Sequence, residues 1–203
     1  VFHLDHGKNV VLIKKIIKSG LYTSVMFDGS RLSFKDNIKQ TREIVKLAHI
    51  KNITVEAELG VIKGTEDKVS AQKDLFTDPA QALEFVSQTG CDALAVSIGT
   101  SHGAFKFVGT PKLDIERLKL IAQIVKVPLV LHGASGIDAH QLNKLHEKCD
   151  VLGDCERLSG AQGVSDNQIC EAIKNGVAKV NIDSDLRLSF TTAVRLAFLN
   201  DKK

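Results

Sequence analysis

The sequence has no tryptophan, one tyrosine and one methionine, and aromatic residues make up only 5% of its 203 positions. Proteins that bind single-stranded nucleic acid stack the bases on exposed aromatic side chains, so this composition disfavours such a platform. The net charge of +3 is small, and the lysines are scattered along the chain. We therefore expect no nucleic-acid partner.

The chain also lacks long apolar runs and cysteine motifs. No run approaches the roughly 20 apolar residues of a membrane-spanning helix, so we expect no membrane partner. No basic region precedes the apolar run at Val1, so no signal peptide is visible. Cys91, Cys149, Cys155 and Cys170 match no common zinc spacing and no disulfide framework, which leaves a Cys149–Cys155 bond as a minor alternative. Reduced thiols in a cytoplasmic protein are the simplest interpretation.

Short apolar runs alternate with longer amphipathic segments. The runs are nearly continuous in Val, Ile, Leu and Ala, which is typical of parallel strands buried on both faces. These strands are expected at residues 1–5, 24–29, 54–60, 93–99, 128–133 and 178–183. Helices are expected between them, for example at residues 35–50, 79–89, 114–125 and 166–174. Repeated strand–helix alternation predicts an α/β fold with right-handed crossovers.

Two α/β architectures fit this alternation, a doubly wound open sheet and a closed (β/α)8 TIM barrel. No G-x-G-x-x-G sequence follows a strand, which disfavours the dinucleotide-binding form of the open sheet. Nearly every run ends in polar residues, and a barrel gathers such strand ends at one mouth. These residues are Asp5, His6, Asp28, Glu58, Thr100, Ser101, His102, His132, Asn181 and Asp183. We therefore predict that residues 1–203 form a single, partial TIM-barrel domain of about six β/α units.

Three histidines each end a predicted strand and are each followed by glycine. His6, His102 and His132 stand in the sequences DHG, SHG and LHG. A single histidine of this kind is more often a hydrogen-bonded residue near a strand end than a metal ligand. Three of them on converging parallel strands suit a catalytic zinc, which takes three protein ligands and keeps an open position. The neighbouring Asp5 would then serve as a general acid or base, or would orient a ligand.

Other polar segments carry weaker signals. His3 shares a strand face with Asp5 and is interpreted as a buried, hydrogen-bonded histidine. The sequences GTSHGAFKF, HGASG and NIDSD supply small residues, backbone N–H groups and Lys106, which fits an anion site on the loops after the last strands. Residues 57–67 are interpreted either as a mobile loop or as a solvated loop without a role, and residues 143–165 as an extended polar loop.

At these residues the sequence resembles the class II, metal-dependent fructose-bisphosphate aldolases and their tagatose-bisphosphate relatives. The similarity covers essentially the whole chain in family order, through HLDHG, SVMFDGS, VEAELGVIKGTED, DALAVSIGTSHGAFKF, PKLDIERL, PLVLHGASGI and GVAKVNIDSDLR. The resemblance implies a TIM barrel that binds Zn²⁺ through His6, His102 and His132. It also implies that Glu58 matches a glutamate that binds a metal in some members.

The resemblance further implies the reaction and the roles of other residues. The reaction is the reversible cleavage of fructose 1,6-bisphosphate to dihydroxyacetone phosphate and glyceraldehyde 3-phosphate, a step of glycolysis and gluconeogenesis. Asp5 would transfer a proton at the C4 oxygen, and Glu66 would transfer one at the C3 carbon of dihydroxyacetone phosphate. Positions around the substrate phosphate, its hydroxyls and a monovalent cation (Na⁺ or K⁺) match Gly103, Lys106, Gly133, Ser135, Asn181, Asp183 and Ser184. Family members are commonly homodimers or homotetramers.

The sequence departs from the family pattern in three ways. Lys63 stands where a glycine is expected, and residues 143–165 are longer than in the shorter members. The family has two further strands before HLDHG and a helical tail after the last strand, so we expect residues 1–203 to be part of a longer chain. The alternatives are a tagatose-1,6-bisphosphate aldolase, a non-catalytic metal- or phosphate-binding relative, and a metal-free phosphate-binding barrel enzyme. The three histidines and Asp5 argue against the last two.

Overall fold

A computed structural model of the chain describes residues 1–66, 69–71, 76–102, 111–137, 143 and 162–200. Six strands form one sheet in the order β1-β2-β3-β6-β8-β9, and all its neighbouring strands are parallel. The strands are β1 (His3–Gly7), β2 (Ser24–Phe27), β3 (Thr54–Leu59), β6 (Ala93–Val96), β8 (Leu129–Leu131) and β9 (Val177–Val180). Each overlaps one of the six predicted apolar runs, so the predicted parallel α/β alternation is confirmed.

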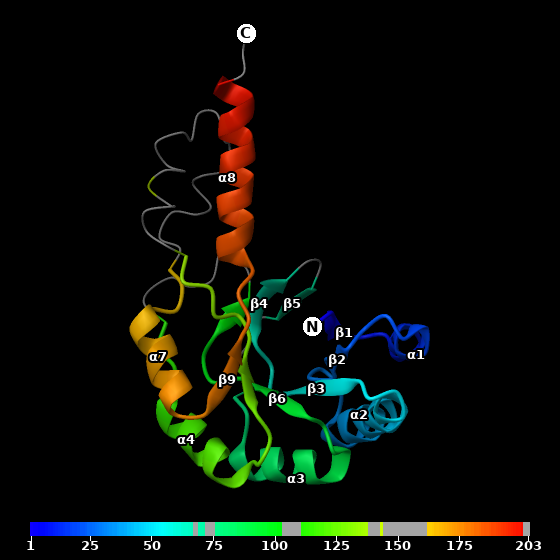
Figure 1. Cartoon of the computed structure of the whole chain (residues 1–203). Coiled ribbons are helices and arrows are strands. Elements are labelled where there is room, and N and C mark those ends of the chain that lie inside the picture. The colour runs from blue at the N-terminus through cyan, green and yellow to red at the C-terminus, as the bar shows by residue number, and fades with distance from the viewer. Residues whose placement is uncertain (67–68, 72–75, 103–110, 138–142, 144–161, 201–203) are drawn as a thin grey trace.

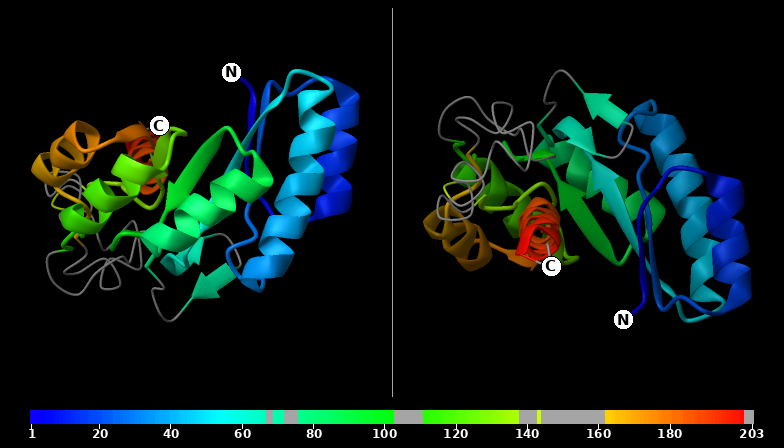
Figure 2. Two further views of the ribbon diagram at one scale, coloured as in Figure 1. Left: turned by 90° about the horizontal axis from the view of Figure 1, so that it is seen from below. Right: turned by 90° about the horizontal axis from the view of Figure 1, so that it is seen from above.

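Helices follow the strands and lie along the outer side of the sheet (Figures 1 and 2). They are α1 (Val10–Ser19), α2 (Phe34–His49), α3 (Pro79–Thr89), α4 (Ile115–Ile124) and α7 (Asp166–Lys174), and a further helix, α8 (Ser184–Asn200), follows β9. Local signals fix their ends: Asp78, for example, accepts a hydrogen bond from the Gln81 N–H at the start of α3, and Gly90 takes a left-handed conformation at its end. Both α3 and α7 have the predicted bounds.

The sheet is strongly curved. The carboxylate of Asp5 on β1 lies 3.3 Å from the side-chain nitrogen of Asn181, which follows β9. Because β1 and β9 are the two edges of the six-stranded sheet, they would be about 24 Å apart if the sheet were flat. Two short side chains cross that distance only if the sheet curls and brings its edges together.

Side chains alternate between an outer, apolar face and an inner face. On β2, Val25 and Phe27 pack in the main hydrophobic core beneath the helices, whereas Met26 faces inward. Met26 forms a small inner cluster with Ala95 and Val130 from β6 and β8. Both faces are therefore buried, which explains the nearly continuous apolar runs.

A second, three-stranded sheet differs from the sequence interpretation. It contains β4 (Lys63–Glu66), β5 (Val69–Ala71) and β7 (Ser101–His102) in the order β5-β4-β7. The interpretation of residues 57–67 as a loop is therefore wrong for the backbone of β4. That segment pairs with residues 101–102, which are remote in sequence, and its composition carried no sign of this partner.

In Figure 1, α8 runs away from the sheet. Among the described residues, no helix has both the length and the apolar character needed to cross a membrane.

Candidate metal centre

The carboxyl ends of β1, β2, β3 and β8 bring two overlapping groups of metal-binding side chains together. The first group is Asp5, His6 and His132, and the second is His6, Asp28 and Glu58. Within each group the candidate ligand atoms all lie within 4.8 Å of one another. The clustering of these strand ends at one mouth was expected from the sequence.

His6 faces this cluster because the backbone of β1 departs from regular strand geometry. Alternation would place Asp5 inward and His6 outward. The pairing of β1 with β2 shifts register between Leu4 and Gly7, and His6 has a φ of 43°, in the left-handed region that non-glycine residues rarely adopt. This irregularity turns the His6 ring toward His132, and the two ring centroids are 4.5 Å apart in an edge arrangement.

Two buried carboxylates lie close to His6. Its Nδ1 is 3.4 Å from Asp28 Oδ2 and 3.5 Å from Glu58 Oε2, and both carboxylate side chains are almost fully buried. Lys8 reaches the same Asp28 oxygen at 3.5 Å. Imidazole nitrogens and carboxylate oxygens are ligands that Zn²⁺ accepts, so this donor set fits a divalent metal ion.

The electrostatics favour the protonation states that a metal requires. Burial would raise the pKa of Asp5, but its contact with His3 and the nearby charges of His132, His6 and Lys179 hold that pKa well below its ordinary value. Burial likewise opposes ionisation of Asp28, and hydrogen bonds from His6 and Ser30 together with the charges of His6 and Lys8 lower its pKa.

The pKa of His132 is also lowered, which favours its neutral form. Its burial lowers the pKa of the imidazole, although the carboxylate of Glu56 acts in the opposite direction. Ionised carboxylates and a neutral imidazole are the forms that bind metal ions.

Asn181, which follows β9 at the other edge of the sheet from β1, contacts two members of the first group. Its side-chain nitrogen lies 3.3 and 3.4 Å from the Asp5 carboxylate oxygens and 3.2 Å from Nδ1 of His132. His3, on the same inner face, places Nδ1 2.8 Å from Ser24 Oγ. The interpretation of His3 as hydrogen-bonded is confirmed, although its side chain is 19% exposed rather than fully buried.

The segments that follow β8 and β9 are joined by hydrogen bonds. Buried Ser135 accepts hydrogen bonds at its Oγ from the backbone N–H groups of Asp183 and Ser184, each at 3.2 Å. Gly133 has a φ of 63°, and a Cβ built there would come within 2.6 Å of the Ser101 carbonyl oxygen. Only glycine suits this close approach.

Several predicted site residues are not placed. His102 and Glu66 have described backbones, in β7 and β4, but their side chains lie outside the described part of the structure. Gly103 and Lys106 lie outside the described residues, as do Cys149 and Cys155 and most of the segment 143–165. The side chain of Lys63 is likewise outside it.

Sequence reasoning gave no role to three inner-face residues. Asp28 was noted only as a strand end, and Glu56 and Lys179 were not singled out. Both missed residues carry a period-two signal, since Glu56 stands two positions before Glu58 and Lys179 two positions before Asn181.

Comparison with known families now decides the relationship. The family model of class-II fructose-bisphosphate aldolase matches residues 1–203. The chain belongs to this family. Class II aldolases are metal-dependent, in agreement with the two groups of candidate ligands.

Individual relatives support the assignment over nearly the whole chain. The fructose-bisphosphate aldolase of Helicobacter pylori strain 26695 is 45% identical over 202 residues, which are 98% of this chain and 64% of the relative. That of Thermus caldophilus is 44% identical over 195 residues, which are 95% of this chain and 62% of the relative. The chain thus spans less than two thirds of the length of these relatives.

Solved structures share the fold. The YdjI aldolase of Escherichia coli K12 has a TM-score of 0.67 and 36% sequence identity, over 96% of this chain and 56% of that one. The fructose-bisphosphate aldolase of Campylobacter jejuni has a TM-score of 0.69 at 24% identity, over 100% of this chain and 57% of that one, and so supports the fold alone.

Proposed function

We propose that this chain carries the metal centre and the proton-transfer group of an aldolase that reversibly cleaves fructose 1,6-bisphosphate to dihydroxyacetone phosphate and glyceraldehyde 3-phosphate. The observation that carries the proposal is the convergence of Asp5, His6 and His132 at the carboxyl ends of β1 and β8. We propose further that the six units belong to an eight-unit TIM barrel and that residues 1–203 are part of a single domain. The approach of Asp5 to Asn181 across the sheet edges supports a closed barrel.

In this proposal His6, His132 and His102 hold Zn²⁺, and Glu58 offers a further ligand. When bound, the metal acts as a Lewis acid that polarises the ketone carbonyl of the substrate. The carboxylate of Asp5 removes the proton from the C4 hydroxyl during cleavage and returns it during condensation. Asn181, within 3.4 Å of both Asp5 oxygens, holds that carboxylate in place.

The remaining predicted residues are assigned to substrate binding. The proposed contacts to a substrate phosphate, through hydrogen-bond donors, or to a monovalent cation (Na⁺ or K⁺), through oxygen atoms, come from Gly103, Lys106, Gly133, Ser135, Asp183 and Ser184. Phosphate contacts would fix the orientation of the substrate relative to Asp5 and the metal. Glu66 is proposed to transfer the proton at the C3 carbon.

We also propose a cytoplasmic homodimer or homotetramer. The face of α8 supports association with a second copy of the chain, because Leu186, Phe190 and Phe198 recur at four- and eight-residue spacing and are all largely exposed.

The experiment is a cleavage assay on the natural-length protein with added Zn²⁺ or with a chelator. We expect cleavage of fructose 1,6-bisphosphate that the chelator abolishes and Zn²⁺ restores. If only tagatose 1,6-bisphosphate is cleaved, the protein is a tagatose-1,6-bisphosphate aldolase rather than a fructose-1,6-bisphosphate aldolase. Zinc binding without cleavage of either sugar would favour a non-catalytic relative, and cleavage that survives removal of all metal would refute the metal centre.

A further inference from the structure

Glu56 is a buried carboxylate on the inner face of the sheet that the proposed reaction does not use. It lies on β3, its side chain is only 4% exposed, and both of its oxygens have charged or polar partners. Oε1 is 2.7 Å from Nε2 of His132, and Oε2 is 2.5 Å from Nζ of Lys179 on β9. Burying a carboxylate is costly unless it is paired in this way.

The partners of Glu56 determine how the His132 ring is protonated. The Lys179 ammonium group can only donate hydrogen bonds, so it favours an ionised Glu56 whose other oxygen accepts. His132 must then donate from Nε2, and a neutral ring has its lone pair on Nδ1. On that side, Asn181 Nδ2 lies 3.2 Å from Nδ1, which agrees with an accepting nitrogen.

The arrangement also fixes where the ring points. Glu56 and Lys179 stand on strands that are separated in the sheet by β6 and β8, and His132 follows β8 directly. The Glu56–Lys179 ion pair therefore spans the inner face of the curved sheet. Through Glu56 it holds the His132 ring, which is 1% exposed, at its Nε2 atom. The opposite ring nitrogen, Nδ1, faces the group formed by Asp5 and His6.

We propose that Glu56, held by Lys179, is a positioning residue that keeps Nε2 of His132 protonated and presents Nδ1 to the metal. This inference rests on the metal centre of the proposed function. It assigns no contact with substrate or metal to Glu56. A hydrogen-bonded carboxylate behind a histidine ligand fixes the ring orientation and increases the basicity of the ligand nitrogen.

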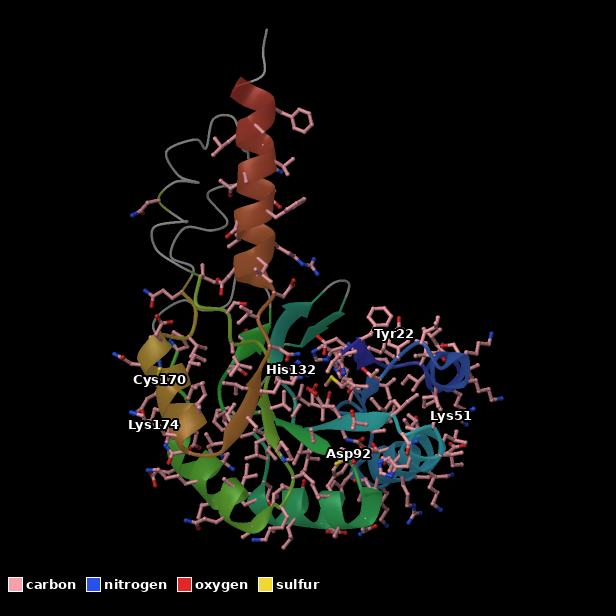
Figure 3. The ribbon with its side chains drawn as sticks, viewed as in Figure 1. Tyr22, Lys51, Asp92, His132, Cys170 and Lys174 are labelled. Carbon is pink, nitrogen blue, oxygen red and sulfur yellow. The ribbon has the colours of Figure 1, made fainter. Side chains whose placement is uncertain are left out.

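The test compares Glu56→Ala and Glu56→Gln with Asp92→Asn. Asp92 is a matched control because it accepts a 2.7 Å hydrogen bond from the N–H of Val55, the residue next to Glu56, and contacts His49. It thus supports the same strand without touching His132, and in Figure 3 it lies well below the labelled His132. The Glu56→Gln side chain would keep an oxygen for His132, and Lys179, 39% exposed, can turn to solvent.

Two measurements on the natural-length protein decide the question. Competition titration should show that Glu56→Ala weakens Zn²⁺ binding about 10- to 100-fold, that Glu56→Gln weakens it less, and that Asp92→Asn leaves it unchanged. In the chelated protein, the His132 Nε2–H proton should give a slowly exchanging NMR signal in the wild type, in Asp92→Asn and in Glu56→Gln, and none in Glu56→Ala. A purely structural role would move neither reading in a well-folded Glu56→Ala protein.

Unchanged zinc affinity in Glu56→Ala, an equal loss in Asp92→Asn, or a His132 signal that persists without Glu56 would overturn the inference. If Glu56→Ala does not fold, the inference is tested with Glu56→Gln, which should keep the His132 Nε2–H signal. Loss of that signal in Glu56→Gln would overturn the proposed hydrogen bond from His132 Nε2 to the side chain of residue 56. A wild-type protein that binds no zinc would refute the metal centre of the proposed function instead. The NMR signal would still decide whether Glu56 positions the His132 ring.

Discussion

At the scale of single residues, the candidate site depends on one irregular position in β1. Regular alternation would point Asp5 and His6 in opposite directions, yet both belong to the same group of candidate ligands. The register shift and the φ of 43° at His6 make this possible. Backbone strain of this kind occurs where a side chain must be aimed at a functional site.

Replacing Asp5 by Asn tests the proton-transfer role. The amide occupies the same space and can still contact Asn181, but it cannot accept the proton of the C4 hydroxyl. We expect kcat for fructose 1,6-bisphosphate cleavage to fall by about 10²- to 10⁴-fold while bound zinc, measured by elemental analysis, stays at the wild-type level. Asp92→Asn is the control and should keep full activity. Wild-type turnover in Asp5→Asn would remove Asp5 from the mechanism.

The residues of the site were only partly predictable from the sequence. His6, His132 and Asp5 could be found because histidines followed by glycine recurred at strand ends, and because the same motifs carry the family resemblance. Glu56 and Lys179 were missed because each lies inside an apolar run, and their contact joins strands 123 positions apart in the chain. No local pattern reports a partner at that separation.

At the scale of elements, the segment after β8 is packed closely against β7 and the start of α8. Gly133 approaches the backbone of Ser101, and the Asp185 carboxylate accepts hydrogen bonds from the N–H groups of Gly136 and Ile137 at 2.9 and 2.7 Å. These contacts set the position of Ser135, which is proposed to contact the substrate phosphate or the cation.

Two alanine substitutions in this segment should differ sharply. Gly133→Ala introduces a Cβ 2.6 Å from the Ser101 carbonyl oxygen at a positive φ, and we expect it to lower the free energy of unfolding by about 1–3 kcal/mol. Gly136→Ala is the matched control, because the nearest atom to its Cβ is 3.5 Å away and no unusual φ is required. Urea denaturation measures both. Equal stabilities would show that the close approach of Gly133 to β7 is not a constraint.

The secondary structure was predictable wherever the signals were local. Buried parallel strands read as apolar runs, and both α3 and α7 have the bounds predicted from local signals. Asp78 caps the start of α3, although Ser165 makes no side-chain capping hydrogen bond at the start of α7. Strand ends were placed less well: the run at residues 1–5 corresponds to β1 at His3–Gly7. The pairing of β4 with β7 depends on a remote partner and was not visible in the sequence.

At the scale of the whole molecule, the two faces of the curved sheet differ in composition and in role. The outer face carries the main hydrophobic core beneath the helices, whereas the inner face combines a small apolar cluster with ionisable groups. Burial in the folded state shifts the pKa values of several of these groups, so the stability of the metal-free protein must depend on pH.

The direction of this dependence follows from the shifts. The pKa values of Asp5, Asp28 and Glu56 are lowered on folding, so their contribution is present above about pH 4.5 and is lost as the pH falls further. The pKa of His132 is also lowered, so the unfolded chain takes up a proton first, below about pH 6.5, and stability falls there too.

We therefore expect the free energy of unfolding, measured by urea denaturation in chelator, to decrease steadily from pH 7.5 to pH 4. His132→Asn should flatten the part of this curve between pH 7 and pH 5.5, because it removes the imidazole whose pKa is lowered by burial. A stability that stays constant or rises toward acid pH would contradict the assigned burial of these groups.

Anomalous diffraction at the zinc edge, from crystals of the natural-length protein soaked in Zn²⁺, would locate the metal itself. We predict a peak within about 2.0–2.1 Å of one imidazole nitrogen each of His6 and His132, with His102 supplying a third nitrogen. A bound zinc that contacts neither His6 nor His132 would contradict the assignment of the inner-face cluster as the metal centre of a class II aldolase.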